Sequence, residues 1–161
     1  MGIKEVERIK NIFNELNINP TYLEHQPVIT SEEAAQTRGF ELKQGIKAIL
    51  FTNEQDWAIV DVPADKKVDQ KAVAAQLGWP KSKIRMATPE EVLQKTGCEI
   101  GAVPPFGHKE LIPLLVDRQV YDNLESAFNI GLRTHSVKIK TKLMRIVFEK
   151  VNGKEGNYAK P

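Results

Sequence analysis

The sequence is poor in cysteine, in long apolar runs and in net charge, and each shortage excludes a class of protein. Cys98 is the only cysteine among 161 residues, so no disulfide can form within the chain. The N-terminal residues are charged rather than apolar, so we expect no signal peptide, no membrane span and a cytosolic protein. The formal net charge of +2 is too small to predict nucleic-acid binding by itself.

Motifs for metals, nucleotide cofactors and covalent catalysis are also missing. The three histidines, His25, His108 and His135, and Cys98 have none of the close spacings that bind metals. No Walker motif and no dinucleotide-binding fingerprint occurs. Cys98 lacks a Cys/His signature, which favours a buried thiol over a nucleophile. We therefore expect neither a metal nor a cofactor.

The length and the 41% hydrophobic content fit one domain. Helical spacing and capping signals predict helices over residues 6–16, 30–38, 69–77 and 88–96, and around 143–147. Runs rich in β-branched and aromatic residues predict strands at 22–25, 47–52, 57–62, 84–87, 111–116 and 135–139. This order lacks a strict strand–helix alternation and indicates an α+β domain over residues 1–151. Residues 152–161 have no apolar period, and we expect a mobile C-terminal tail.

The most informative segment runs from Thr96 to His108 and contains three glycines and two prolines. Glycine lets backbone N–H groups approach a ligand without a Cβ between them, and proline restricts a loop to few conformers. Such a loop suits carbonyl, carboxylate or phosphate oxygens. A purely structural turn is the alternative interpretation.

Two sets of basic residues are candidate ligand contacts. Lys47 opens an apolar strand, where its ammonium could reach a neighbouring pocket, although a lysine at a strand end is more often solvated. A second set forms the densest basic cluster of the chain, which is either a solvated face or a contact for phosphates. It consists of Lys138, Lys140, Lys142 and Arg145.

Several motifs follow one another in an order that is informative as a whole. They are His25-x-Pro27-x-x-Thr30, Gly45-x-Lys47, Arg85-Met86-Ala87, Thr96-Gly97-x3-Gly101-x2-Pro104-Pro105-Phe106-Gly107, and Asp117 after Leu114-Leu115-Val116. In this order the chain resembles the YbaK/ProX family over residues 20–150. Members of that family are free-standing relatives of the editing domain of bacterial prolyl-tRNA synthetase.

The resemblance implies a compact α+β domain with a mixed, largely antiparallel, curved sheet flanked by helices. It also implies a trans-editing aminoacyl-tRNA deacylase that removes a small mischarged amino acid without a metal. In the family, the lysine matching Lys47 is the residue most tied to activity, and the glycine matching Gly101 lines the aminoacyl pocket. Water or a group of the substrate makes the attack. The implied partner is mischarged aminoacyl-tRNA, and an aminoacyl-tRNA synthetase is a second candidate.

Further residues become candidate contacts through the same resemblance. His135 is a candidate counterpart of a histidine that some members carry near the last strand, whereas Ala48 lacks the amide or hydroxyl found in some relatives. The expected substrate contacts are His25, Ile29, Thr30, Leu50, Val103, Pro105, Phe106, Gly107 and His135. The expected tRNA contacts are Lys138, Lys142 and Arg145.

Two other functions fit these residues. A non-catalytic module would bind tRNA or an amino acid through the same fold. A small-molecule esterase would hydrolyse simple aminoacyl esters and ignore the tRNA. The sequence leaves the amino acid, the tRNA and the oligomeric state open.

Overall fold

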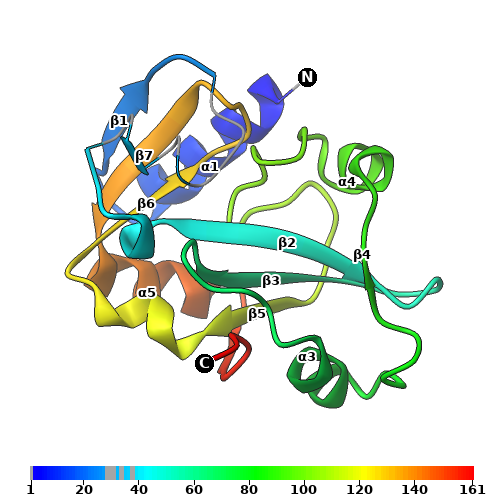
Figure 1. The fold of residues 1–161 in the computed structure, drawn as a ribbon. Helices are drawn as coiled ribbons and strands as arrows, with labels where there is room; N and C mark the ends of the chain where they lie inside the picture. The colour runs from blue at the N-terminus through cyan, green and yellow to red at the C-terminus, as the bar shows by residue number, and fades with distance from the viewer. Residues whose placement is uncertain (1, 28–31, 33–34, 37–38) are drawn as a thin grey trace.

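The protein contains two β-sheets (Figure 1). The computed structural model describes residues 2–27, 32, 35–36 and 39–161. The smaller sheet is antiparallel with the strand order β1-β7-β6, and the larger sheet is mixed with the order β4-β2-β3-β5-β8. In the larger sheet, β2 pairs antiparallel with β3 and β4, and β5 pairs parallel with β3 and β8. The strands are β1 (Thr21–Glu24), β2 (Ile46–Thr52), β3 (Trp57–Pro63), β4 (Arg85–Met86), β5 (Leu114–Asp117), β6 (Glu125–Asn129), β7 (His135–Lys140) and β8 (Lys154–Gly156).

This architecture confirms the α+β class and corrects the expectation of one curved sheet. A parallel bridge between Gly45 and Ala127 joins the two sheets at the start of β2. A Cβ atom on Gly45 would lie 3.0 Å from the Cβ atom of Ala64, so glycine permits close packing on the residue that follows β3.

The helices begin and end close to the predicted signals. They are α1 (Ile3–Glu15), α3 (Gln70–Leu77), α4 (Pro89–Thr96) and α5 (Thr141–Lys150), with 3-10 turns at Leu42–Gln44 and Arg118–Asp122. The Asp69 side chain caps α3, and Thr88 and Glu91 form the predicted capping box of α4. Within the described part of the chain, no helix has the length and apolar character needed to cross a membrane.

The predicted helix from Thr30 to Arg38 lies in part outside the described residues. Of that segment, Glu32, Ala35 and Gln36 are helical. Gly39 follows with a φ of 74°, a conformation that glycine adopts readily after a helix.

The main hydrophobic core is centred on Phe106 of the glycine- and proline-rich loop. Its ring is fully buried and contacts the rings of Phe13, Phe128 and Phe148 edge to face at centroid distances of 5.4, 5.9 and 6.4 Å. These partners come from α1, α5 and β6 of the smaller sheet, which together fix this end of the loop.

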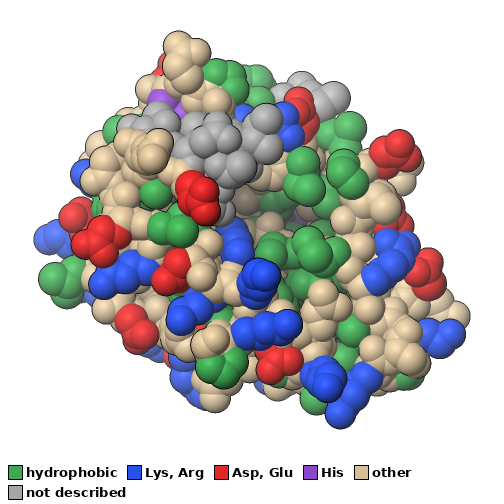
Figure 2. Space-filling view, viewed as in Figure 1, with side chains coloured by type: hydrophobic (Ala, Val, Ile, Leu, Met, Phe, Trp, Pro, Cys, Tyr) green, Lys and Arg blue, Asp and Glu red, His purple; other side chains and the backbone are tan. Residues whose placement is uncertain are grey.

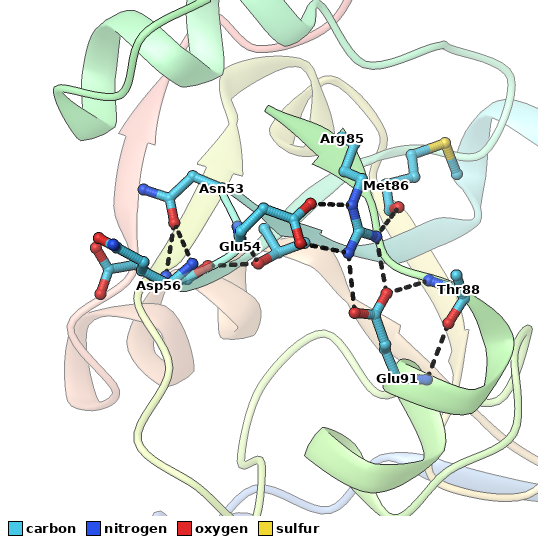
Figure 3. Close-up of polar contacts among 9 residues, drawn as sticks. Asn53, Glu54, Asp56, Arg85, Met86, Thr88 and Glu91 are labelled. Atoms are coloured by element: carbon cyan, nitrogen blue, oxygen red, sulfur yellow. Dashed lines mark hydrogen bonds and ion pairs between the residues drawn. The ribbon is translucent and has the colours of Figure 1, made fainter. Parts of the chain in front are cut away.

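The other end of the loop is fixed through α4, by Arg85 (Figure 3). The Arg85 guanidinium donates to Glu54 in the β2–β3 turn at 2.6 Å and to Glu91 in α4 at 2.8 Å. Its hydrogen bond lowers the pKa of the Glu91 carboxyl to about 2, with a further contribution from the Thr88 N–H. The network ties the start of α4 to the larger sheet.

The C-terminal residues, expected to form a mobile tail over residues 152–161, include a strand of the larger sheet. Residues 154–156 form β8 on the edge of β5, and Tyr158 is 2% exposed. One carboxylate oxygen of Asp117 accepts hydrogen bonds from the N–H groups of Tyr158 at 2.7 Å and Ala159 at 3.0 Å. A buried carboxylate that accepts two backbone donors is well satisfied, and it ties Tyr158 and Ala159 to the end of β5.

Candidate functional site

The glycine- and proline-rich loop leaves α4 at Gly97 and makes a β-turn over Glu99–Ala102. The Ala102 N–H donates to the Glu99 carbonyl at 2.9 Å. Gly101 has a φ of 84°, whereas Ile100 is not among the residues with positive φ, so the turn is of type II. Gly101 is exposed, and the residues from Ala102 to Phe106 are buried. The backbone of the turn is therefore exposed to solvent, while the residues that follow it are anchored in the core.

The second half of this loop is held by His108 and Gly107. Burial lowers the pKa of the His108 imidazole to about 4, so the ring is neutral and its Nε2–H donates to the Pro104 carbonyl at 2.7 Å. A Cβ atom on Gly107 would lie 2.7 Å from Ile12 Cδ1, so this glycine permits close packing on α1.

A chain of hydrogen bonds connects Gly101 to His25. The Asn129 amide nitrogen donates to the Gly101 carbonyl at 2.5 Å, and the Ser136 hydroxyl donates to the Asn129 side-chain oxygen at 2.9 Å. His25 Nε2 lies 2.7 Å from the Ser136 oxygen. Because a carbonyl can only accept, the Asn129 amide nitrogen is the donor to Gly101, and the amide oxygen accepts from Ser136. His25 Nδ1 also lies 2.8 Å from the Gln26 carbonyl oxygen, so the tautomer of the ring decides which of its nitrogens donates.

Sequence reasoning named His25 and Gly101 but missed Asn129 and Ser136. Both are buried polar residues, with exposed fractions of 8% and 0%. They lie 28 and 35 positions after Gly101 in the sequence, on β6 and β7. No local motif marks them, and only the pairing of these strands brings them to the turn.

Lys47 lies near the start of β2 and is half-buried. Burial lowers the pKa of its ammonium below the ordinary value, the Asp65 charge opposes this effect, and the Lys67 charge adds to it. β4 joins the open edge of β2 at Phe51 and Thr52, so among the described residues no strand covers that edge beside Lys47. An uncovered strand edge offers N–H and C=O groups to a ligand.

The face that carries β2 is hollowed near its centre (Figure 2). In that view hydrophobic side chains line the right side of the hollow, and lysine and arginine side chains lie below it. This combination of apolar and cationic surface suits a ligand with a small apolar group and an anionic part.

The other predicted substrate contacts are placed in different surroundings. Leu50 and Phe106 are buried in the main core, and Val103 and Pro105 are buried in the loop. His135 is directed to Thr134 and Glu24, with ring-nitrogen distances of 2.8 and 3.4 Å. Ile29 and Thr30 lie outside the described residues.

The predicted tRNA contacts fall into two places. The Lys138 ammonium lies 4.4 Å from the centre of the Phe40 ring. Lys142 and Arg145 instead line a surface groove of about 540 Å³ together with Tyr121 and Leu124. The Arg145 guanidinium covers the Tyr121 ring at 3.9 Å and pairs with Glu155 at 3.4 Å, whereas Lys142 is exposed.

Cys98, the residue after Gly97 in the loop, is buried. Burial raises the pKa of its thiol to about 12, and the charge of Glu5 adds to this effect. A protonated, buried thiol is a poor nucleophile, so Cys98 is a structural residue.

Comparisons with known proteins agree with the motifs. The aminoacyl-tRNA editing domain family matches residues 25–146. The chain is 33% identical over 124 residues to the multifunctional Ser/Thr-tRNA deacylase ProXp-y of Escherichia coli K12, which covers 73% of this chain and 72% of that protein. It is 35% identical over 86 residues to the proline–tRNA ligase of Thermosipho melanesiensis, and this match covers 53% of the chain and 15% of the ligase.

A solved structure shares the fold. A proposed trans-editing enzyme for prolyl-tRNA synthetase superimposes with a TM-score of 0.82 at 23% identity, and 98% of each chain is covered. Since the family match extends from His25, just after β1, into α5 and so over most of the chain, this protein belongs to the aminoacyl-tRNA editing domain family.

Proposed function

We propose that the chain is a trans-editing aminoacyl-tRNA deacylase, which hydrolyses the ester bond between a small mischarged amino acid and tRNA. The observation that carries the proposal is the exposed type II turn at Gly101. Its N–H has no hydrogen-bond partner among the described residues, while the carbonyl of the same glycine is bonded to Asn129. A fixed backbone N–H without a protein partner is suited to stabilise an oxyanion.

The reaction needs few protein groups. Water adds to the ester carbonyl carbon, the carbonyl oxygen takes negative charge, and the Gly101 N–H donates to that oxygen. The bond to the ribose oxygen then breaks, and this oxygen takes up a proton as the free 3′ end is released. The half-buried Lys47 ammonium holds the terminal ribose and phosphate, so that the ester lies at the turn. No side-chain nucleophile is required.

Seryl and threonyl esters are the first substrates to test, because the Escherichia coli relative is named as a Ser/Thr-tRNA deacylase. A second catalytic site is useful for small amino acids, because one methylene changes binding to a synthetase by only about 1–3 kcal/mol.

The test is a panel of tRNAs charged with serine, threonine, alanine, cysteine or proline. We expect the purified protein to release one or two of these amino acids at least about 10-fold faster than spontaneous hydrolysis. A simple aminoacyl methyl ester is the control for an esterase. Equal rates on the methyl ester and the charged tRNA would favour the esterase, and binding of tRNA without release would favour the non-catalytic module.

The predicted tRNA contacts give a separate test through salt. Removing one side chain that binds a phosphate should reduce the slope of log affinity against log salt by about 0.9. We therefore expect Lys142→Ala to lower that slope by about one unit and to leave methyl-ester hydrolysis unchanged. Lys81→Ala, an exposed lysine between α3 and β4, is the matched control. A flat salt dependence in the unmodified protein would refute phosphate binding by this cluster.

A further inference from the structure

We propose that Asn129 and Arg133 are positioning residues that hold the turn at Gly101 so that its N–H is directed to the ester carbonyl oxygen. Both belong to the β6–β7 hairpin, and together we call them the carbonyl clamp. The inference rests on the proposed deacylase function, and it adds a structural cause for the direction of the donor.

Arg133 is the stronger half of the clamp. Its Nε and one terminal nitrogen donate to the Ile100 carbonyl at 3.0 and 2.8 Å. Its other terminal nitrogen pairs with the Glu99 carboxylate at 2.8 Å. The guanidinium thus contacts two consecutive residues of the turn, and its side chain is only 24% exposed. Charge-assisted hydrogen bonds from a planar guanidinium restrict both distance and orientation.

Because the peptide bond is planar, these contacts also determine the direction in which the Gly101 N–H points. In a trans peptide, C=O and the following N–H point to opposite sides, and the described chain contains no cis peptide. When Arg133 holds the Ile100 carbonyl on one side, the Gly101 N–H must point to the other side. The next peptide is fixed as well, because its carbonyl accepts from Asn129 and its N–H donates to Glu99.

The two peptides that flank Gly101 therefore have four polar groups, and three are bonded. The Ile100 carbonyl, the Gly101 carbonyl and the Ala102 N–H have partners, while the Gly101 N–H has none in the described part of the chain. Selective bonding of this kind leaves one backbone donor for a ligand.

Glycine at this position makes a clamp useful. A type II turn changes to type I by rotation of its central peptide, and glycine at the third position imposes no steric barrier to either state. Rotation would replace the Gly101 N–H by the Ile100 carbonyl oxygen, which repels a developing oxyanion. By holding the Ile100 carbonyl, Arg133 disfavours the rotated state.

The hairpin that carries the clamp is itself held in place. Gly131 at its tip has a φ of 127°, and a Cβ atom there would lie 2.9 Å from the Glu5 Cβ and from the Gly2 carbonyl oxygen. The tip therefore packs on the start of α1. At the base, Ser136 and His25 fix the Asn129 amide. Both donors of the clamp extend from a rigid support.

The catalytic test compares Arg133→Ala with Arg133→Lys, which keeps the charge but cannot span both turn residues in one plane. We expect kcat on the preferred aminoacyl-tRNA to fall by about 10–100-fold in Arg133→Ala, with KM changed less than about 3-fold. Arg133→Lys should recover little of this loss, and added ethylguanidinium should recover part of it in Arg133→Ala. Arg118→Ala, an exposed arginine of the 118–122 turn, is the matched control and should stay within about 2-fold of wild type.

The clamp is also measurable without a substrate, by ¹⁵N relaxation of the Gly101 amide. We expect an order parameter near about 0.85 in the unmodified protein and below about 0.6 in both Arg133→Ala and Asn129→Asp. Asn129→Asp keeps the shape of the side chain, removes the donor and places a carboxylate oxygen against the Gly101 carbonyl.

The outcomes separate the clamp from the proposed function. An unchanged Gly101 order parameter in both variants would overturn the clamp. A lowered order parameter with wild-type kcat would overturn its catalytic effect. Absence of deacylation in a protein with a rigid Gly101 amide would overturn the proposed function and the catalytic role of the clamp. The structural role of Asn129 and Arg133 in holding the turn would still be supported.

Discussion

Replacement of Lys47 by alanine is expected to lower kcat/KM for aminoacyl-tRNA by about 100-fold or more while the protein stays folded. Lys47 lies on the part of β2 that β4 does not pair with, and the proposed mechanism assigns its ammonium to bind the terminal ribose and phosphate. Without it, the ester would seldom lie at the Gly101 turn. The measurement is release of labelled amino acid from the preferred tRNA under single-turnover conditions.

Stability should change little in this variant. Burial already lowers the pKa of the Lys47 ammonium, which means that the fold disfavours its charge. Removing the charge relieves that penalty, so a folded and inactive protein is expected, as judged by its melting temperature.

The matched control is Lys67→Ala. Lys67 is exposed and lowers the pKa of Lys47 through its charge, so its removal changes the electrostatics around Lys47 without removing the proposed contact. We expect at most about a 3-fold change in kcat/KM. Equal losses in both variants would indicate a general effect of positive charge, and wild-type activity in Lys47→Ala would refute the assignment of Lys47.

The sequence predicts those elements whose signals are local. The capping box of Thr88 and Glu91, the cap at Asp69 and the β2–β3 hairpin depend on residues a few positions apart, and the structure confirms each of them. Interactions within one helical turn or one hairpin join residues that are close in the sequence, so the sequence alone predicts them.

Elements that depend on distant partners were not predicted. β6 contains Ser126 and Asn129 and lacks a clear apolar period, yet it pairs with β7 along its whole length. β8 consists of Lys154, Glu155 and Gly156, which are poor strand formers, and it exists because β5 offers an edge and Asp117 accepts two N–H groups beyond it. Tertiary contacts override local propensity in both places.

In the candidate site, too, some residues are marked by local signals and others depend on distant partners. The Gly101 turn and Lys47 follow from local composition and from motif order. Asn129 and Arg133 lie 28 and 32 positions from Gly101, and the strand register that brings them to the turn is not encoded near either residue. The predicted strand 111–116 begins three residues later, at Leu114, because Pro113 has no N–H for a sheet and Leu111 is fully exposed.

The second large expected effect is a change in protein stability when Asp61 is replaced. It lies on β3 in the middle of the larger sheet, opposite Ala48 of β2 and Val116 of β5, and it is fully buried. Neither carboxyl oxygen has a hydrogen-bond partner among the described residues. Burial raises the pKa of this carboxyl well above its ordinary value of 3.8, so the fold favours the protonated form.

The sign of the pH dependence follows from this shift. Below about pH 4 the carboxyl is protonated in both the folded and the unfolded chain, and Asp61 has no ionisation penalty. As the pH rises, the unfolded chain releases the proton while the folded chain keeps it, so the free energy of unfolding decreases up to the folded pKa. We expect Asp61→Asn, which cannot ionise, to be more stable than wild type by about 1–4 kcal/mol at pH 7.

Urea unfolding of both proteins between about pH 3.5 and 8 tests this expectation, because the gain should vanish near the acid end of that range. Asp117→Asn is the matched control with the opposite sign. The Asp117 carboxylate accepts N–H groups from Gln119, Tyr158 and Ala159, so its replacement should destabilise the protein at pH 7 by about 1–3 kcal/mol. A gain in Asp61→Asn that is the same at every pH would contradict an ionisation penalty. It would mean that the carboxyl destabilises the core through its packing or its unpaired oxygens, and not through its proton.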